Sequence, residues 1–112
     1  MLKSKEEVFE LLKQLGNTRE EIVEKLRSLG IKGEMRSCSR CPIARYFLHS
    51  KACDAVSVAG GHDSLLIGLV DLRTSEVGRY KFRYDSHPSI REVFDFINAF
   101  DRGYYPWLNV NA

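Results

Sequence analysis

The hydrophobic positions near the N-terminus recur three and four residues apart, over residues 8–15 and again over residues 22–29. This spacing places them on one stripe of an amphipathic helix in each case. Ser4 and Thr18 precede the two stretches, each with a Glu three positions later, which is the pattern of a capping box. Gly16 is expected to end the first helix in a left-handed conformation. The N-terminal part therefore predicts a helical hairpin with a short turn.

The middle of the chain carries three stretches that are typical of strands. Residues 54–59 and 78–84 alternate apolar and polar positions, as a strand with one wet side does. Residues 65–72 are apolar or glycine at every position but Asp71, which is typical of a strand covered on both faces. We expect an antiparallel meander in chain order. Its last strand is expected to turn one set of side chains to water, Arg79, Lys81 and Arg83, and the other set to the core, Tyr80, Phe82 and Tyr84.

Two more helices are expected outside these stretches. A short one covers residues 42–50, where a proline suits the first turn and Cys41 precedes it as the N-cap. Pro88 opens a last helix, whose apolar stripe runs to a stop at Gly103. The aromatic residues within 104–108 surround a proline and cannot continue the helix, so we expect them to fold back over the core.

The order of these elements predicts one α+β domain: a three-stranded antiparallel meander with an N-terminal helical hairpin, a short middle helix and a C-terminal helix. A chain of 112 residues with 44% hydrophobic composition can bury one core of this size. Its expected parts are the helical hairpin (1–30), the basic loop and short helix (31–53), the meander (54–84), the C-terminal helix (85–103) and the aromatic tail (104–112).

The composition indicates a compartment. The N-terminus lacks the apolar core of a secretory signal, and no run of ~18 apolar residues is present, so we expect a cytoplasmic protein without a membrane partner. The three cysteines are an odd number, which in a reducing compartment favours thiols over a disulfide framework.

The net charge of +2 conceals two basic segments. Residues 27–51 carry six bases against Glu34, and residues 73–84 carry four bases against Glu76. A face shared by both segments would attract a polyanion or an acidic protein. The candidate binding residues are Arg36, Arg40, Arg45, Arg79, Lys81 and Arg83, with Trp107 of the aromatic tail as a second docking point.

Candidate chemistry is sparse. Cys38 and Cys41 both precede the proline that opens the short helix, unlike the cysteines of a thioredoxin-like site. Together with His49 and Cys53 they have the ligand types of a zinc site, although a helix would carry His49 about 12 Å from its start. The run His-Asp-Ser at residues 62–64 resembles a triad only on paper, because neighbours in a turn cannot aim at one another.

Direct nucleic-acid binding is an alternative that the bases leave open. The helical hairpin is an unsuitable reader of DNA, because Glu20, Glu21 and Glu24 crowd the start of its second helix and would repel phosphate. The strand over residues 78–84 separates its bases from its aromatic rings, whereas sheet-based RNA readers need both on one face. Phosphate contacts without base specificity are what such a strand could make.

Two segments carry a further pattern: residues 41–48 read Cys-Pro-Ile-Ala-Arg-Tyr-Phe-Leu, and residues 100–108 read Phe-Asp-Arg-Gly-Tyr-Tyr-Pro-Trp-Leu. They resemble the Cys-Pro-Ile/Val-Ala-x-Tyr-Leu stretch and the Phe-Asp-x-Gly-x-Tyr-Pro-x-Leu ending of small uncharacterised single-domain proteins of high-GC bacteria and their phages. The resemblance brings no known activity. It implies that Cys41 belongs to the pattern, while Cys38 and Cys53 need not.

We therefore expect a non-catalytic binding module, as an accessory protein or a phage-type inhibitor, that engages an acidic protein or a nucleic-acid-binding assembly through a basic surface. The alternatives are a protein that binds nucleic acid directly and a small zinc-binding domain that uses Cys38, Cys41, His49 and Cys53. No enzymatic activity and no cofactor are expected.

Overall fold

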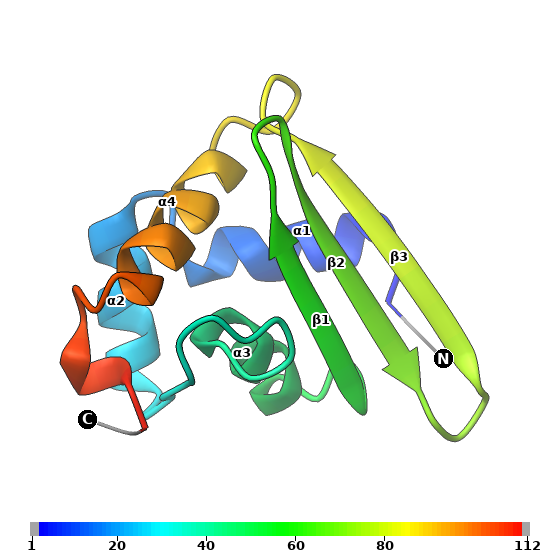
Figure 1. Cartoon of the computed structure of the whole chain (residues 1–112). Helices are drawn as coiled ribbons and strands as arrows, with labels where there is room; N and C mark the ends of the chain where they lie inside the picture. The colour runs from blue at the N-terminus through cyan, green and yellow to red at the C-terminus, as the bar shows by residue number, and fades with distance from the viewer. Residues whose placement is uncertain (1–2, 111–112) are drawn as a thin grey trace.

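The computed structural model describes residues 3–110 and confirms the predicted α+β class (Figure 1). The sheet has the strand order β1-β2-β3, and both neighbouring pairs are antiparallel. The predicted first and last parts of the chain include residues 1–2 and 111–112, which lie outside the described residues. The elements are α1 (Lys5–Leu15), α2 (Arg19–Ser28), α3 (Pro42–His49), β1 (Ala55–Gly60), β2 (Ser64–Asp71), β3 (Glu76–Arg83), α4 (Ile90–Asp101) and the 3-10 helix η1 (Pro106–Leu108).

The helical hairpin begins as its capping signals predict. The Ser4 hydroxyl accepts the Glu7 N–H at 3.2 Å, and the Glu7 carboxylate accepts the Ser4 N–H at 2.9 Å. Thr18 caps α2 by accepting the Glu21 N–H at 3.2 Å, whereas the Glu21 carboxylate accepts the N–H of Asn17 at 2.8 Å, one residue before the Thr18 N–H that a capping box uses. Gly16 differs from the prediction, because its φ of 148° and ψ of 157° are not those of a left-handed helical cap. The chain enters α2 so soon that a Cβ on Gly16 would lie 2.8 Å from the Glu21 Cβ.

The helices pack on one side of the sheet. Figure 1 shows α1 crossing behind the strands, with α3 and α4 beside it, and no helix of the described residues lies on the near face. Alternate residues of β2 are fully buried by this layer, with Leu65 and Leu69 at 0% exposure. Leu66 between them is 48% exposed. The prediction that residues 65–72 are covered on both faces is therefore wrong, because the helices of residues 3–110 cover one face of the sheet and leave the other open.

The aromatic side chains of β3 face that layer. Phe82 is fully buried, Tyr84 is 8% exposed, and the half-buried Tyr80 donates its hydroxyl to the Lys3 carbonyl oxygen. The ring of Phe82 also meets His87, whose carbonyl oxygen accepts the N–H of Ile90 at 3.0 Å as α4 begins. The rings of β3 therefore face the helices and its cations face water, as the alternation predicts.

The aromatic tail both closes the core and leaves two rings outside. Tyr105 stacks on Phe96 of α4 with ring centroids 5.5 Å apart, and Leu108 is 1% exposed. Tyr104 and Trp107 remain 62% and 49% exposed. The expected fold-back over the core thus holds for part of the tail, because successive side chains of this short segment point in different directions.

Candidate binding surface on the open face of the sheet

The near face of the sheet has no covering layer among the described residues, and we call it the open face. The strand register aligns its side chains in three rows that cross the sheet at right angles to the strands. From β1 through β2 to β3, the rows are Ala55, Val70 and Val77; Ser57, Gly68 and Arg79; and Ala59, Leu66 and Lys81.

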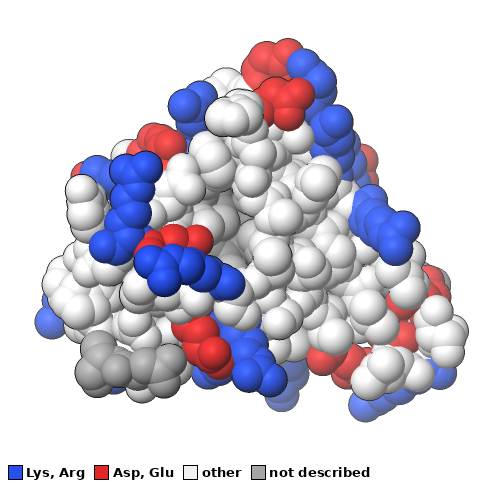
Figure 2. Space-filling model, in the orientation of Figure 1, with Lys and Arg blue, Asp and Glu red and all other residues white. Residues whose placement is uncertain are grey.

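The floor of the open face is apolar and hollowed. A depression of about 570 Å³ is lined by these residues of all three strands. Small side chains on β1 lie low, whereas Leu66 and Val77, at 48% and 60% exposure, stand higher. Figure 2 shows the face as an uncharged area over the sheet, with Lys and Arg along its border on the β3 side. An exposed apolar area with a charged border is typical of a docking surface.

Two of the β3 cations are free of acidic partners in the described part of the chain. Among the described residues Arg79 and Lys81 form no ion pair, and both are exposed. Arg83 differs, since its guanidinium lies 3.3 Å from Asp85 and 3.8 Å from Asp63. Its hydrogen bond to Asp85 raises the pKa of Arg83 and lowers the pKa of the Asp85 carboxyl. Arg79 and Lys81 are therefore the cations of β3 that are available to a partner.

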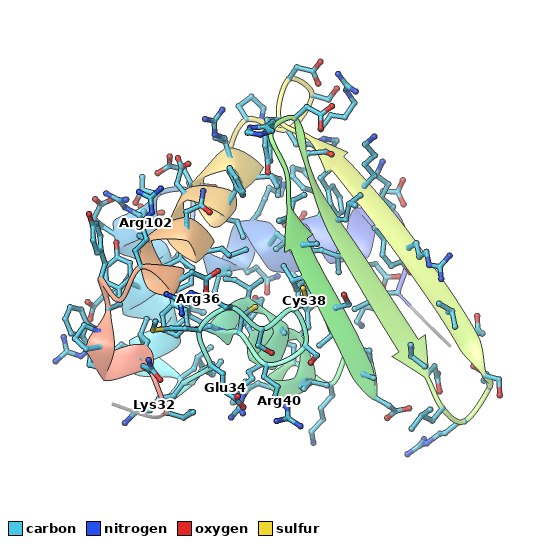
Figure 3. All side chains as sticks on the ribbon, viewed as in Figure 1. Lys32, Glu34, Arg36, Cys38, Arg40 and Arg102 are labelled. Carbon is cyan, nitrogen blue, oxygen red and sulfur yellow. The ribbon has the colours of Figure 1, made fainter. Side chains whose placement is uncertain are left out.

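The other predicted cations lie beyond β1, across the sheet from β3. Arg40 and Arg45 approach the same carboxylate oxygen of Glu34 at 3.6 and 3.5 Å, so one acid partly neutralises both. They line a second depression beside β1, of about 390 Å³. Arg36 lies in the loop between α2 and α3, on the α4 side of that loop (Figure 3), and its backbone N–H donates to the Asp101 carboxylate at 2.8 Å. The six predicted bases thus form two groups on either side of the sheet.

Trp107 belongs to neither group. Its ring meets Tyr105 edge-on at a centroid distance of 5.8 Å, in η1. Figure 1 shows η1 at the opposite end of the molecule from β3. The structure therefore separates the predicted aromatic docking point from the open face.

Sequence reasoning missed the floor of the surface. The apolar run predicts that Leu66, Gly68 and Val70 are covered on both sides, which leaves the cations of β3 as the candidates on this face of the sheet. A signal was available in β1, whose alternate residues Ala55 and Ser57 are small and carry no charge. This signal becomes informative only when the strand register is known, and the sequence alone does not give the register.

The cysteines form no assembled site in the described part of the chain. Cys38 is exposed, whereas Cys41 is buried at the start of α3, where its sulfur accepts the Ala44 N–H at 3.4 Å. Burial raises the pKa of the Cys41 thiol to about 11. No group of three or more His, Cys, Asp or Glu in residues 3–110 is placed to hold a metal ion, so Cys38, Cys41, His49 and Cys53 are not brought together.

Residues 62–63 form a bend between β1 and β2, and Ser64 is the first residue of β2. The Ser64 hydroxyl donates to the Asp63 carboxylate at 3.1 Å, and no hydrogen bond joins His62 to either of them. A catalytic triad requires the nucleophile to contact the base and the base to contact the acid. These contacts do not form that arrangement.

Comparison of the chain with protein-family models, with curated proteins and with solved structures found no match. The resemblance to small proteins of high-GC bacteria and their phages stays a prediction. Within residues 3–110, none of the helices has the length and apolar character needed to cross a membrane.

Proposed function

We propose that the protein is a non-catalytic binding module whose open face takes an acidic protein partner. The observation that carries the proposal is the position of Arg79 and Lys81, two cations without acidic partners within residues 3–110, at the border of an exposed apolar floor. An apolar floor contributes binding free energy when a partner buries it. Unpaired charges at its border orient a partner of opposite charge. A partner segment with apolar and acidic side chains on one face matches both features.

A protein partner fits this surface better than a nucleic acid. Sheets that bind single strands stack bases on exposed rings while neighbouring cations hold the phosphates. Here the open face has no aromatic side chain in any of its three rows. The rings of Phe82 and Tyr84 are buried against the helices. Leu66 and Val77 offer an apolar contact, which suits another protein.

A second copy of the chain is a poorer occupant. A symmetric pair buries the same patch on both copies, so each residue must find its partner within that patch. The three rows contain Arg79 and Lys81 and no Asp or Glu. Pairing two open faces would therefore remove both cations from water without an acid to meet them, which is unfavourable.

The test uses a short peptide with the repeat Leu-Ser-Glu-Ser, which places Leu and Glu on one face when extended. We call it the acidic peptide. Fluorescence anisotropy measures its binding to the wild type, to the pair Arg79→Glu and Lys81→Glu, and to the control pair Lys25→Glu and Arg27→Glu. The control changes the net charge equally on an exposed part of α2.

The wild type and the control should bind the acidic peptide, and the Arg79 and Lys81 variant should bind at least about tenfold more weakly, which is ~1.4 kcal/mol. A peptide with Lys in place of Glu should not bind. The proposal is overturned if the acidic peptide does not bind, if both charge variants lose binding equally, or if a single-stranded oligonucleotide binds more tightly than the acidic peptide.

A further inference from the structure

One glycine at the centre of the open face is not required by the fold. Gly60 and Gly78 also lie in strands, but a Cβ on Gly60 would overlap the Phe94 ring, and a Cβ on Gly78 would overlap the Tyr80 side chain. At Gly68 the nearest atom to an added Cβ is the Ser57 Cβ, at 3.8 Å, which is an ordinary contact. Its φ is not positive either, so any residue could adopt this backbone.

Glycine in the interior of a strand weakens the strand, because it adds conformational freedom to the unfolded chain and packs no side chain. A β-branched residue at this position would be the choice of a sequence selected for stability alone. The glycine at Gly68 is therefore a local departure from the rule that the rest of β2 follows, and such departures concentrate at functional sites.

The missing side chain opens a notch in the middle row. Gly68 lies between the row of Leu66 and the row of Val70, which form the two walls. Its direct neighbour on β3 is Arg79, which closes one end of the notch with a charge that has no acidic partner in the described residues. The notch is thus apolar along its sides and cationic at one end.

We propose that this notch receives one apolar side chain of the acidic partner, while a carboxylate two residues along the partner chain pairs with Arg79. The inference rests on the proposed function and names its recognition pattern. Side chains two residues apart on an extended segment are separated by about 7 Å and point the same way. Directly paired Cα atoms of antiparallel strands are about 5 Å apart, and the Arg79 side chain extends beyond its Cα.

The experiment compares Gly68→Val with the wild type and with Ser28→Val, which places the same side chain at an exposed position of α2, outside the open face. Thermal unfolding measures the fold, and anisotropy with the acidic peptide measures binding. Gly68→Val should unfold at the same or a higher temperature and bind at least about tenfold more weakly. Ser28→Val should keep its affinity within about threefold. Gly68→Ala, which fills less of the notch, gives the same comparison should the valine variant not fold.

Two peptide changes complete a double-mutant cycle. Replacing Leu by Ala in the acidic peptide should weaken binding to the wild type and leave the residual binding to Gly68→Val unchanged. Replacing Glu by Gln should weaken binding to the wild type more than binding to Arg79→Gln. If a folded Gly68→Val binds as tightly as the wild type while the Arg79 and Lys81 charge variant has lost binding, the notch inference is overturned and the proposed function stands. No binding by the wild type overturns both.

Discussion

Two leucines of one strand test whether β2 is covered on one face or on two. Leu66 and Leu69 lie three positions apart, so they point to opposite faces of the sheet. Leu69 is fully buried against the helical layer, and Leu66 on the open face is 48% exposed. The perturbation is the same in both cases, Leu66→Ala and Leu69→Ala, which makes each variant the control of the other.

The expected losses of stability differ severalfold. Fully burying the carbons that Leu→Ala removes contributes about 2.4 kcal/mol at ~0.8 kcal/mol per CH₂, and a closed core adds a term for the cavity left behind. Leu69→Ala should therefore lower the free energy of unfolding by about 3–4 kcal/mol. Leu66→Ala removes a half-exposed group and leaves no closed cavity, so its loss should be about 1 kcal/mol.

Urea unfolding followed by circular dichroism measures both free energies, with thermal unfolding as a second readout. At ~4 °C per kcal/mol for a domain of this size, the two melting temperatures should differ by about 8–12 °C. Equal losses in the two variants would refute the reasoning, since they would mean that a second layer covers β2. A loss above about 2.5 kcal/mol for Leu66→Ala would mean the same.

Further predictions concern the hairpin turn and the cysteines. Gly16→Ala should lower the free energy of unfolding by about 1–3 kcal/mol in urea, because φ is 148° and the new Cβ would lie 2.8 Å from the Glu21 Cβ; an unchanged midpoint would contradict this turn geometry. Iodoacetamide at pH 8 should modify the exposed Cys38 first, since burial raises the pKa of the Cys41 thiol to about 11; equal rates by mass spectrometry would show that Cys41 is accessible. The folded pKa of Cys41 lies above the ordinary 9.0 of a thiol, so the contribution of the neutral Cys41 thiol to the free energy of unfolding should be complete below about pH 9. This contribution should be lost as pH rises through about 11, as a pH series of urea titrations would measure.

Local signals were sufficient for most of the fold. Ser4 and Thr18 cap the helices that follow them, and Cys41 precedes the proline that begins α3, because capping depends on residues only three or four positions away. The alternation in β3 also predicted which side chains meet the core, since side-chain direction along a strand is fixed by its period of two.

The surface could not be predicted to the same degree, because it depends on contacts between distant segments. An unbroken apolar run does not reveal whether the second face of a strand has a covering layer, and for Leu66 it has none. Nor does charge counting reveal pairing. Glu34 approaches both Arg40 and Arg45, while Glu76, the single acid of the other basic segment, forms no ion pair with Arg79 or Lys81 in the described residues.

The features of the middle row are more informative together than singly. One role of cations on an edge strand is to discourage pairing with another sheet. That role alone would explain Arg79 and Lys81 without any binding partner. It does not explain Gly68, which lies in the central strand, where it weakens the sheet and protects no edge. Gly68 and Arg79 are direct neighbours in the register, under the depression that the helices leave uncovered. A role in solubility alone does not account for a notch beside Arg79, whereas the proposed recognition of an apolar side chain next to a carboxylate accounts for both.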